Sequence, residues 1–188
     1  MNRIVLDKAA VLVVDVQAGL FNAQPPPFEA SEVIERINHI TARARAAGVP
    51  VFFTQQDGSE EENLAPLTDG WRLHPRVAVA PGDRIIRKTT CDAFFETPLE
   101  PELRSRGVDS LLICGFATDF CVDATVWNAV SKGFDVIVVG DGHTTTDSPV
   151  LEARRIRDHY NWAWPNAASR RPVRVLEAAA VAFRTMGA

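Results

Sequence analysis

Three polar residues stand where short apolar runs of the sequence end, and together they could carry out nucleophilic chemistry. Cys121 precedes a helical pattern that begins near Val122. A thiol at a helix N-terminus faces unpaired amides and the positive end of the helix dipole, which favours its thiolate. Asp15 directly follows the apolar run 10–14, and Lys88 ends the run 84–88. From the residues alone, a capping aspartate and a solvated lysine are the alternative interpretations.

The other two cysteines have weaker claims to chemistry. Cys114 lies inside an apolar run and is expected to be a small buried hydrophobe, whereas Cys91 is expected to be an exposed or supporting thiol without an assigned role. Three cysteines without a CxxC motif do not suit a disulfide framework or a zinc ribbon. Reduced thiols, together with the lack of an export signal or a membrane-length apolar run, predict a cytoplasmic protein with no membrane partner.

The elements that must position these residues follow an alternating pattern of strand and helix. Short apolar runs predict buried strands, and a stripe of apolar residues with a spacing of three or four predicts a helix over 33–47. Further helices are expected around 99–103 and 122–130, and Gly48, Gly107 and Gly133 mark the helix-to-strand loops. The predicted strands of this pattern are 10–14, 51–53, 111–114 and 136–139.

This alternation predicts an α/β fold: a three-layer, doubly wound, mostly parallel sheet with helices on both faces, forming a single domain over residues 1–188. Towards the C-terminus we expect a helix over 151–160, a strand over 173–176 and a last helix over 177–183. In such sheets the ligand crevice lies beyond the carboxyl ends of the strands. The long segment 55–83 is expected to be either a functional loop near this crevice or a solvated excursion.

Composition and charge exclude several classes of function. The chain has 188 residues, 46% of them hydrophobic, and a net charge of -4 from 20 basic and 24 acidic side chains. A charge of this sign without a basic run does not suit nucleic-acid binding. A nucleotide or flavin module is also disfavoured, because the segment 15–20 after the first strand has a single glycine and an acidic residue where a phosphate loop needs glycines.

Three segments give the sequence a family resemblance. In order and spacing they resemble the three signatures of the isochorismatase-like cysteine hydrolase superfamily, which includes nicotinamidases. The resemblance implies a catalytic triad in which Cys121 is the nucleophile, Asp15 accepts its proton and Lys88 is the cation between them. A lysine ammonium there would lower the cost of holding two negative charges in one pocket. The three segments are Val13-Val14-Asp15-Val16-Gln17, Lys88-Thr89-Thr90 leading to Ala93-Phe94, and Gly115 to Val122.

The resemblance also implies a reaction. The bond between Phe116 and Ala117 is expected to be cis, which would aim the amides of Ala117 and Cys121 at a developing oxyanion. The implied activity is cleavage of a small amide-type C–N bond through a thioester acyl-enzyme. Isochorismatases that cleave a vinyl ether lack the cysteine nucleophile, so its presence here points to amide-like small-molecule substrates. A thiol redox sensor, or an oligomeric binding protein without hydrolysis, is the alternative function.

The sequence departs from the nicotinamidase pattern at the metal site. Nicotinamidases carry histidines after the second strand, whereas this chain has Thr54-Gln55-Gln56-Asp57-Gly58 there. The four histidines, His39, His74, His143 and His159, show no paired ligand spacing. We therefore predict no metal and no other cofactor, and nicotinamide becomes a less favoured substrate.

Two aromatic residues match the places where the family has substrate-contacting rings. Phe21 follows the first strand and Trp71 lies in the long loop, and both are predicted to bind substrate, with ordinary core packing as the alternative. The family resemblance further implies a homo-oligomer, either a dimer or a tetramer, for which Trp162, Trp164 and the segment 178–183 are candidate contacts. The sequence leaves the physiological substrate open.

Overall fold

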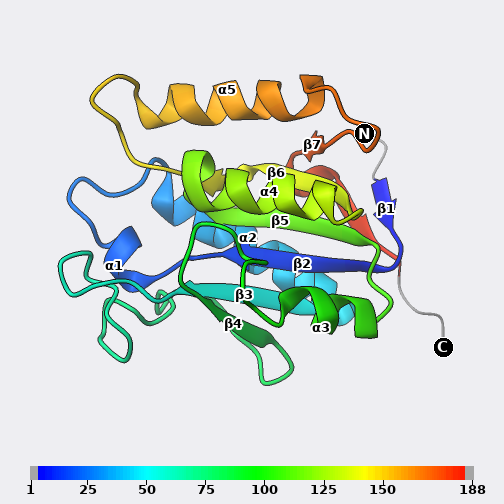
Figure 1. Ribbon diagram of the computed structural model, residues 1–188, viewed down its shortest axis with the longest axis horizontal. Helices are drawn as coiled ribbons and strands as arrows, with labels where there is room; N and C mark the ends of the chain where they lie inside the picture. Colours follow the sequence, from blue (N-terminus) through cyan, green and yellow to red (C-terminus); the bar gives the residue numbers. More distant parts are fainter. Residues whose placement is uncertain (1–3, 185–188) are drawn as a thin grey trace.

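The apolar runs form the centre of one parallel sheet. The computed structural model describes residues 4–184 (Figure 1). Its main sheet has six strands in the order β4-β3-β2-β5-β6-β7, and every neighbouring pair is parallel. The strands are β2 (Ala9–Val14), β3 (Val51–Gln56), β4 (Arg84–Lys88), β5 (Ser110–Phe116), β6 (Asp135–Thr144) and β7 (Arg174–Leu176).

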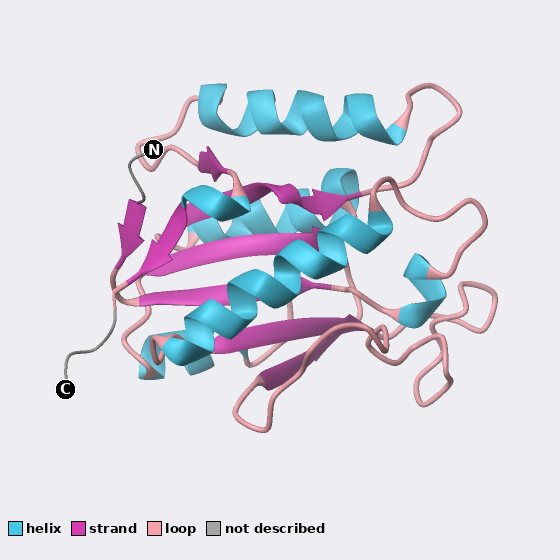
Figure 2. Ribbon diagram, turned by 180° about the vertical axis from the view of Figure 1, so that it is seen from behind, coloured by secondary structure: helices cyan, strands magenta, loops and turns pink. Residues whose placement is uncertain are grey.

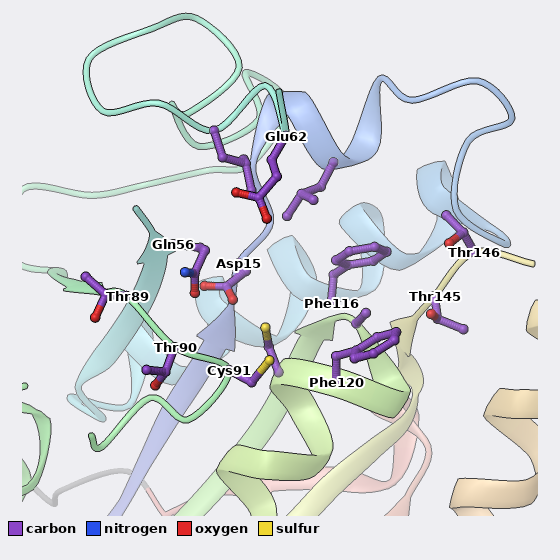
Figure 3. Close-up of a pocket in the computed structure, with 14 residues that line it drawn as sticks. Asp15, Gln56, Glu62, Thr89, Thr90, Cys91, Phe116, Phe120, Thr145 and Thr146 are labelled. Carbon is purple, nitrogen blue, oxygen red and sulfur yellow. The ribbon is translucent and has the colours of Figure 1, made fainter. Parts of the chain in front are cut away.

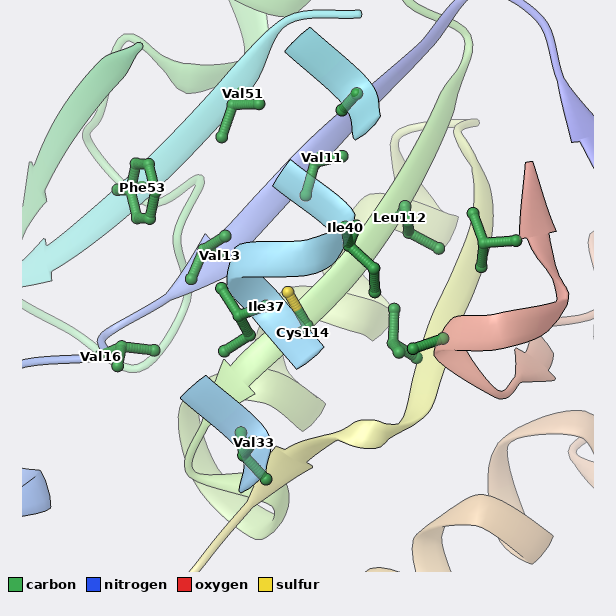
Figure 4. Packing of buried hydrophobic residues seen from close by; sticks show 14 of the residues in the cluster. Val11, Val13, Val16, Val33, Ile37, Ile40, Val51, Phe53, Leu112 and Cys114 are labelled. Atoms are coloured by element: carbon green, nitrogen blue, oxygen red, sulfur yellow. The ribbon is translucent and has the colours of Figure 1, made fainter. Parts of the chain in front are cut away.

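Helices cover both faces of this sheet, which confirms the predicted three-layer α/β architecture (Figure 2). One face is covered by α2 (Ala30–Ala46), whose apolar stripe packs on alternate residues of β2 such as Val11 and Val13 (Figure 4). The residues between them, such as Leu12, face the opposite layer. That layer contains α3 (Leu99–Ser105), α4 (Asp123–Ser131) and α5 (Ala153–Asn166).

Burial on both faces explains why β2 is apolar throughout. All six of its residues are buried, because β3 and β5 flank it in the sheet and helices lie above and below. Gly48, Gly107 and Gly133 have positive φ, as predicted for the loops after helices.

Because the strands are parallel, the carboxyl ends of β2, β3, β4 and β5 meet at one edge of the sheet. This edge lies beside the short helix α1 (Ala18–Phe21) and the segment 57–83 (Figure 1).

The C-terminal segment differs from the prediction. The expected helix over 177–183 is wrong: Ala178–Ala180 form one 3-10 turn, and Val181–Phe183 form the strand β8. This strand pairs in parallel with β1 (Ile4–Leu6), which the sequence analysis did not predict. Local propensity favours a helix for the alanines, but a pairing partner from the other end of the chain overrides that preference.

Two further boundaries also differ. The helix expected over 151–160 begins at Ala153 and continues to Asn166, with the side chain of Trp164 buried against the sheet layer. Trp162 on the same helix is exposed. None of the helices within residues 4–184 combines the length and hydropathy needed to cross a lipid bilayer.

Candidate active site

The three residues predicted to form a triad come together at the carboxyl edge of the sheet. Asp15 follows β2, Lys88 is the last residue of β4, and Cys121 lies in a π-helical turn, Thr118–Val122, that follows β5. Lys88 Nζ is 2.6 Å from Asp15 Oδ2 and 3.5 Å from Cys121 Sγ. The side chains of Asp15 and Lys88 are almost fully buried. The ammonium thus lies between a carboxylate and a sulfur in a site with little access to water.

Asp15 is held in place by the neighbouring strand β3. The hydroxyl of Thr54 donates a hydrogen bond of 2.6 Å to Asp15 Oδ1 and accepts one of 3.2 Å from the Asp15 amide. The residue adopts a left-handed backbone conformation with φ 46°, which turns the chain sharply at the end of β2. These contacts leave Oδ2 facing Lys88, where the two groups form an ion pair.

Lys88 is surrounded by acceptors. Its ammonium donates to the side-chain oxygen of Gln56 at 2.6 Å and to the carbonyl oxygen of Thr90 at 2.9 Å, in addition to its contacts with Asp15 and Cys121. Burial by itself would lower the pKa of Lys88, but the attraction of the Asp15 carboxylate and the hydrogen bonds to Asp15 and to the Cys121 sulfur outweigh it, and the pKa is raised. Lys88 is therefore positively charged at neutral pH.

Cys121 differs from the expectation of a resting thiolate. Burial raises the pKa of its thiol, the Asp15 carboxylate raises it further, and the attraction of Lys88 compensates only in part. Desolvation and a neighbouring negative charge thus act against the lowering of the thiol pKa that the sequence predicted from the helix terminus. At rest the site holds a neutral thiol hydrogen-bonded to the Asp15 carboxylate, an arrangement in which the carboxylate can act as proton acceptor.

The turn that carries Cys121 begins at an unusual stretch of backbone. The peptide bond between Phe116 and Ala117 is cis. Just before it, Gly115 has φ 120° and lies so close to β2 that a Cβ atom there would be 2.1 Å from the carbonyl oxygen of Val14. The amides of Phe120 and Val122 both donate to the carbonyl oxygen of Ala117, which closes the turn.

A buried hydrogen-bond chain supports this turn from below. His143 Nδ1 lies 2.8 Å from Thr118 Oγ1, and its Nε2 lies 2.9 Å from Asn161 Oδ1. The Asn161 amide nitrogen donates to the carbonyl oxygen of Gly140, so Asn161 Oδ1 accepts a hydrogen bond from Nε2–H of His143, and Nδ1 accepts one from the Thr118 hydroxyl. Burial lowers the pKa of His143 to about 4, which keeps the ring neutral. Its position at the end of β6 was the only signal in the sequence.

A cavity of about 480 Å³ opens beside Asp15 and Cys121 (Figure 3). Threonine side chains, two phenylalanine rings and two cysteines line it, and Asp15 and Cys121 lie in its wall. Cys91 shares this wall, which gives it a place in the site that the sequence did not indicate. The lining residues are Asp15, Leu20, Gln56, Glu62, Leu64, Thr89, Thr90, Cys91, Phe116, Ala117, Phe120, Cys121, Thr145 and Thr146.

The structure corrects the two predicted substrate contacts, because neither Phe21 nor Trp71 lines this cavity. Phe21 is buried in the core behind the wall, where its ring packs edge-on against Phe116 at a centroid distance of 5.7 Å. Trp71 anchors the long loop: its indole nitrogen donates to Asp57, and Arg87 stacks on its ring. Phe116 and Phe120 provide the aromatic lining instead.

The residues at the family's metal position have other partners here. Thr54 hydrogen-bonds Asp15, and Gln56 accepts a hydrogen bond from Lys88. Gln56 is itself held by Gln17, a buried side chain that also binds the carbonyl oxygen of Trp71. Within residues 4–184, no three histidine, cysteine, aspartate or glutamate side chains lie close enough to share a metal ion.

Comparison with known proteins agrees with this geometry. The isochorismatase domain family matches residues 9–164, which include all three residues of the predicted triad. The chain belongs to the isochorismatase family. Among solved structures, an isochorismatase family protein superimposes with a TM-score of 0.83 at 29% identity, covering 91% of this chain and 99% of that one.

Two of the relatives that the chain matches carry names that state an activity. A streptothricin hydrolase of Streptomyces noursei is 40% identical over 140 residues, which are 74% of this chain and 56% of the relative. The ureidoacrylate amidohydrolase RutB of Methylorubrum extorquens is 29% identical over 162 residues, or 69% of this chain and 65% of RutB. The chain thus spans little more than half the length of the streptothricin hydrolase that it matches.

Proposed function

We propose that this protein is a cysteine hydrolase that cleaves the C–N bond of a small carboxamide-type substrate through a thioester. The observation that carries the proposal is the position of the Lys88 ammonium, 2.6 Å from the Asp15 carboxylate and 3.5 Å from the Cys121 sulfur, beside a cavity that can hold a small molecule. The names of the two relatives, a hydrolase and an amidohydrolase, support the same class of reaction.

The first half of the reaction forms the thioester. Asp15 takes the proton of the Cys121 thiol, and the sulfur attacks the substrate carbonyl carbon. The carbonyl oxygen becomes an oxyanion that accepts hydrogen bonds from the amides of Ala117 and Cys121. The oxyanion then collapses, the C–N bond breaks, and protonated Asp15 donates its proton to the leaving nitrogen. Lys88 stays charged throughout and stabilises the negative charge as it moves from carboxylate to sulfur.

The second half releases the acid. Asp15, again ionised, removes a proton from a water molecule, and the oxygen of this water attacks the thioester carbonyl. The C–S bond breaks, the sulfur leaves as thiolate, and Asp15 returns the proton to it. The products are a carboxylic acid and ammonia or an amine, and the thiol and the carboxylate are restored.

The neutral thiol at rest determines how this site must work. Because burial and Asp15 raise the pKa of Cys121, the sulfur has to lose its proton during the attack rather than before it. The base must then be a group within hydrogen-bond reach of the sulfur, and the Asp15 carboxylate is such a group. Removing such a base typically slows turnover by about 100-fold to 10,000-fold.

A trapping experiment tests the proposal. The protein is incubated with a panel of small amides, with and without hydroxylamine, and released ammonia or amine is measured together with hydroxamate. We expect nitrogen release from at least one amide, hydroxamate when hydroxylamine intercepts the thioester, and loss of both in Cys121→Ala. Cys114→Ala is the matched control, because this thiol is buried away from the cavity. Turnover that survives Cys121→Ala would refute the mechanism, and silence across the panel would refute the activity.

A further inference from the structure

The charges around the cavity are unbalanced at its mouth. Within residues 4–184 the cavity wall contains two carboxylates, those of Asp15 and Glu62, and no lysine, arginine or histidine. The charge of Asp15 is compensated by Lys88, directly behind the wall. Glu62 forms no ion pair within the same stretch of chain. A molecule that enters the cavity therefore meets one uncompensated negative charge.

Glu62 is fixed in place by its own loop. Its Oε2 accepts hydrogen bonds from the amide of Ser59 at 2.7 Å and from the Ser59 hydroxyl at 3.1 Å, and its own amide donates to that hydroxyl. These hydrogen bonds lower the pKa of Glu62, so it is ionised at neutral pH. Figure 3 shows the side chain of Glu62 reaching from the loop into the cavity, on the side towards Asp15. The carboxylate is thus presented to a ligand rather than to bulk solvent alone.

Two aromatic rings lie in the same cavity. Phe116 and Phe120 project into it from β5 and from the turn that carries Cys121 (Figure 3). Phe120 is 60% exposed, an unusual state for a ring of this size. The face of an aromatic ring attracts a cation, and the carboxylate of Glu62 on another side of the same cavity attracts one as well. A carboxylate or phosphate group would gain from neither.

We propose that the site selects amides that carry an ammonium group, with Glu62 and Phe120 as the residues that recognise this cation. The inference deepens the proposed function, on which it rests for the amide that is cleaved. The amide carbonyl would lie at Cys121 and the ammonium at the mouth of the cavity. The threonine hydroxyls of the wall can hydrogen-bond the polar atoms between these two ends.

The test compares three ligands that share four methylene groups and a carboxamide and differ at the far end. These are 5-aminopentanamide with an ammonium, hexanamide with a methyl group, and adipamate with a carboxylate. Their affinities are measured by titration calorimetry on the full chain carrying Cys121→Ala, so that binding is observed without turnover. Glu62→Gln and Phe120→Leu are introduced in this background. Glu61→Gln is the matched control, because it removes a charge from the same loop outside the cavity wall.

We expect the ammonium ligand to bind about fivefold to tenfold more tightly than hexanamide, and adipamate to bind most weakly. Glu62→Gln, whose amide oxygen keeps the contact with Ser59, should reduce the preference for the ammonium at least about twofold, and Phe120→Leu should reduce it as well. Glu61→Gln should change nothing. Because a surface charge is screened by salt, the preference should shrink in concentrated NaCl.

Three results would overturn the inference: equal affinities, tighter binding of adipamate, or no detectable binding of any of the three. A preference that is unchanged in Glu62→Gln would overturn the role of that residue. Failure of the hydrolase proposal looks different. In that case the Cys121→Ala protein would still prefer the ammonium ligand, but the wild-type protein would release no ammonia from 5-aminopentanamide and form no hydroxamate.

Discussion

Removing the charge of Lys88 should lower the free energy of unfolding of the protein as well as slow the reaction. Lys88→Met keeps an unbranched side chain that lacks the terminal ammonium, and so leaves the Asp15 carboxylate without its cation in a site where both side chains are almost fully buried. Breaking a buried ion pair in this way typically costs about 3 to 5 kcal/mol. That is a large fraction of the about 5 to 15 kcal/mol by which a typical protein is stable.

The pairwise part of this cost follows from the distance. With the charges 2.6 Å apart and an effective dielectric constant of about 20, the Coulomb attraction is about 6 kcal/mol. Asp15→Asn removes the other charge while keeping an oxygen for the hydroxyl of Thr54. The double variant has no buried charge left uncompensated. Its loss of unfolding free energy should therefore be smaller than the sum of the losses in the two single variants. We expect a coupling energy of about 3 to 6 kcal/mol.

The assay is urea unfolding of the wild-type protein, the two single variants and the double variant at neutral pH. Circular dichroism and tryptophan fluorescence should give the same transition for each protein, which justifies a free energy for each. The interaction energy is the difference between the double variant and the sum of the singles. Additivity within about 0.5 kcal/mol would show that the two groups do not interact, and the argument for a charged triad would fail.

Three other changes test separate parts of the structure. The pKa of His143 falls from 6.5 to about 4 on folding, so the unfolded chain takes up a proton before the folded protein does. The contribution of the neutral ring to the free energy of unfolding is therefore complete above pH 6.5 and is lost as the pH falls towards 4. Urea unfolding should therefore show wild type losing about 2 kcal/mol between about pH 7 and pH 5 that His143→Gln does not lose. Thr54→Val should cost about 1 to 3 kcal/mol in urea unfolding and lower kcat, because Asp15 loses its hydroxyl donor; unchanged kcat would contradict this. Gly115→Ala should cost at least about 3 kcal/mol or prevent soluble expression, because its Cβ would overlap backbone, whereas Gly82→Ala, in open space, should unfold like wild type.

Local sequence was a good guide to the elements but a poor guide to their far partners. The apolar runs and the glycines after helices predicted four central strands and three helix-to-strand loops, because these depend on residue type and spacing within a few positions. The pairing of β1 with β8 joins the two ends of the chain, and no local pattern encodes it. The alanines of 178–180 illustrate the failure, since they form only one 3-10 turn before the paired strand β8 begins at Val181.

The candidate site divides in the same way. The positions of Asp15, Lys88 and Cys121 at three predicted strand ends made them candidates, because parallel strands bring their carboxyl ends to one edge, but only the family resemblance selected them as a triad. The sequence could not predict the protonation state of the Cys121 thiol in the folded protein. The neutral thiol of Cys121 results from burial and from the charge of Asp15, and both depend on what surrounds the sulfur in three dimensions.

The lining of the cavity was likewise a tertiary decision. Phe21 and Trp71 are of the aromatic type expected of substrate contacts, but Phe21 packs in the core and Trp71 anchors a loop. Phe116, Phe120 and Glu62 line the cavity instead. Residue type and spacing therefore determined the sheet and the chemistry available at its edge. Which side chains face the cavity, and with what charge, was decided only when distant segments packed together, because burial and electrostatic environment are properties of the assembled structure.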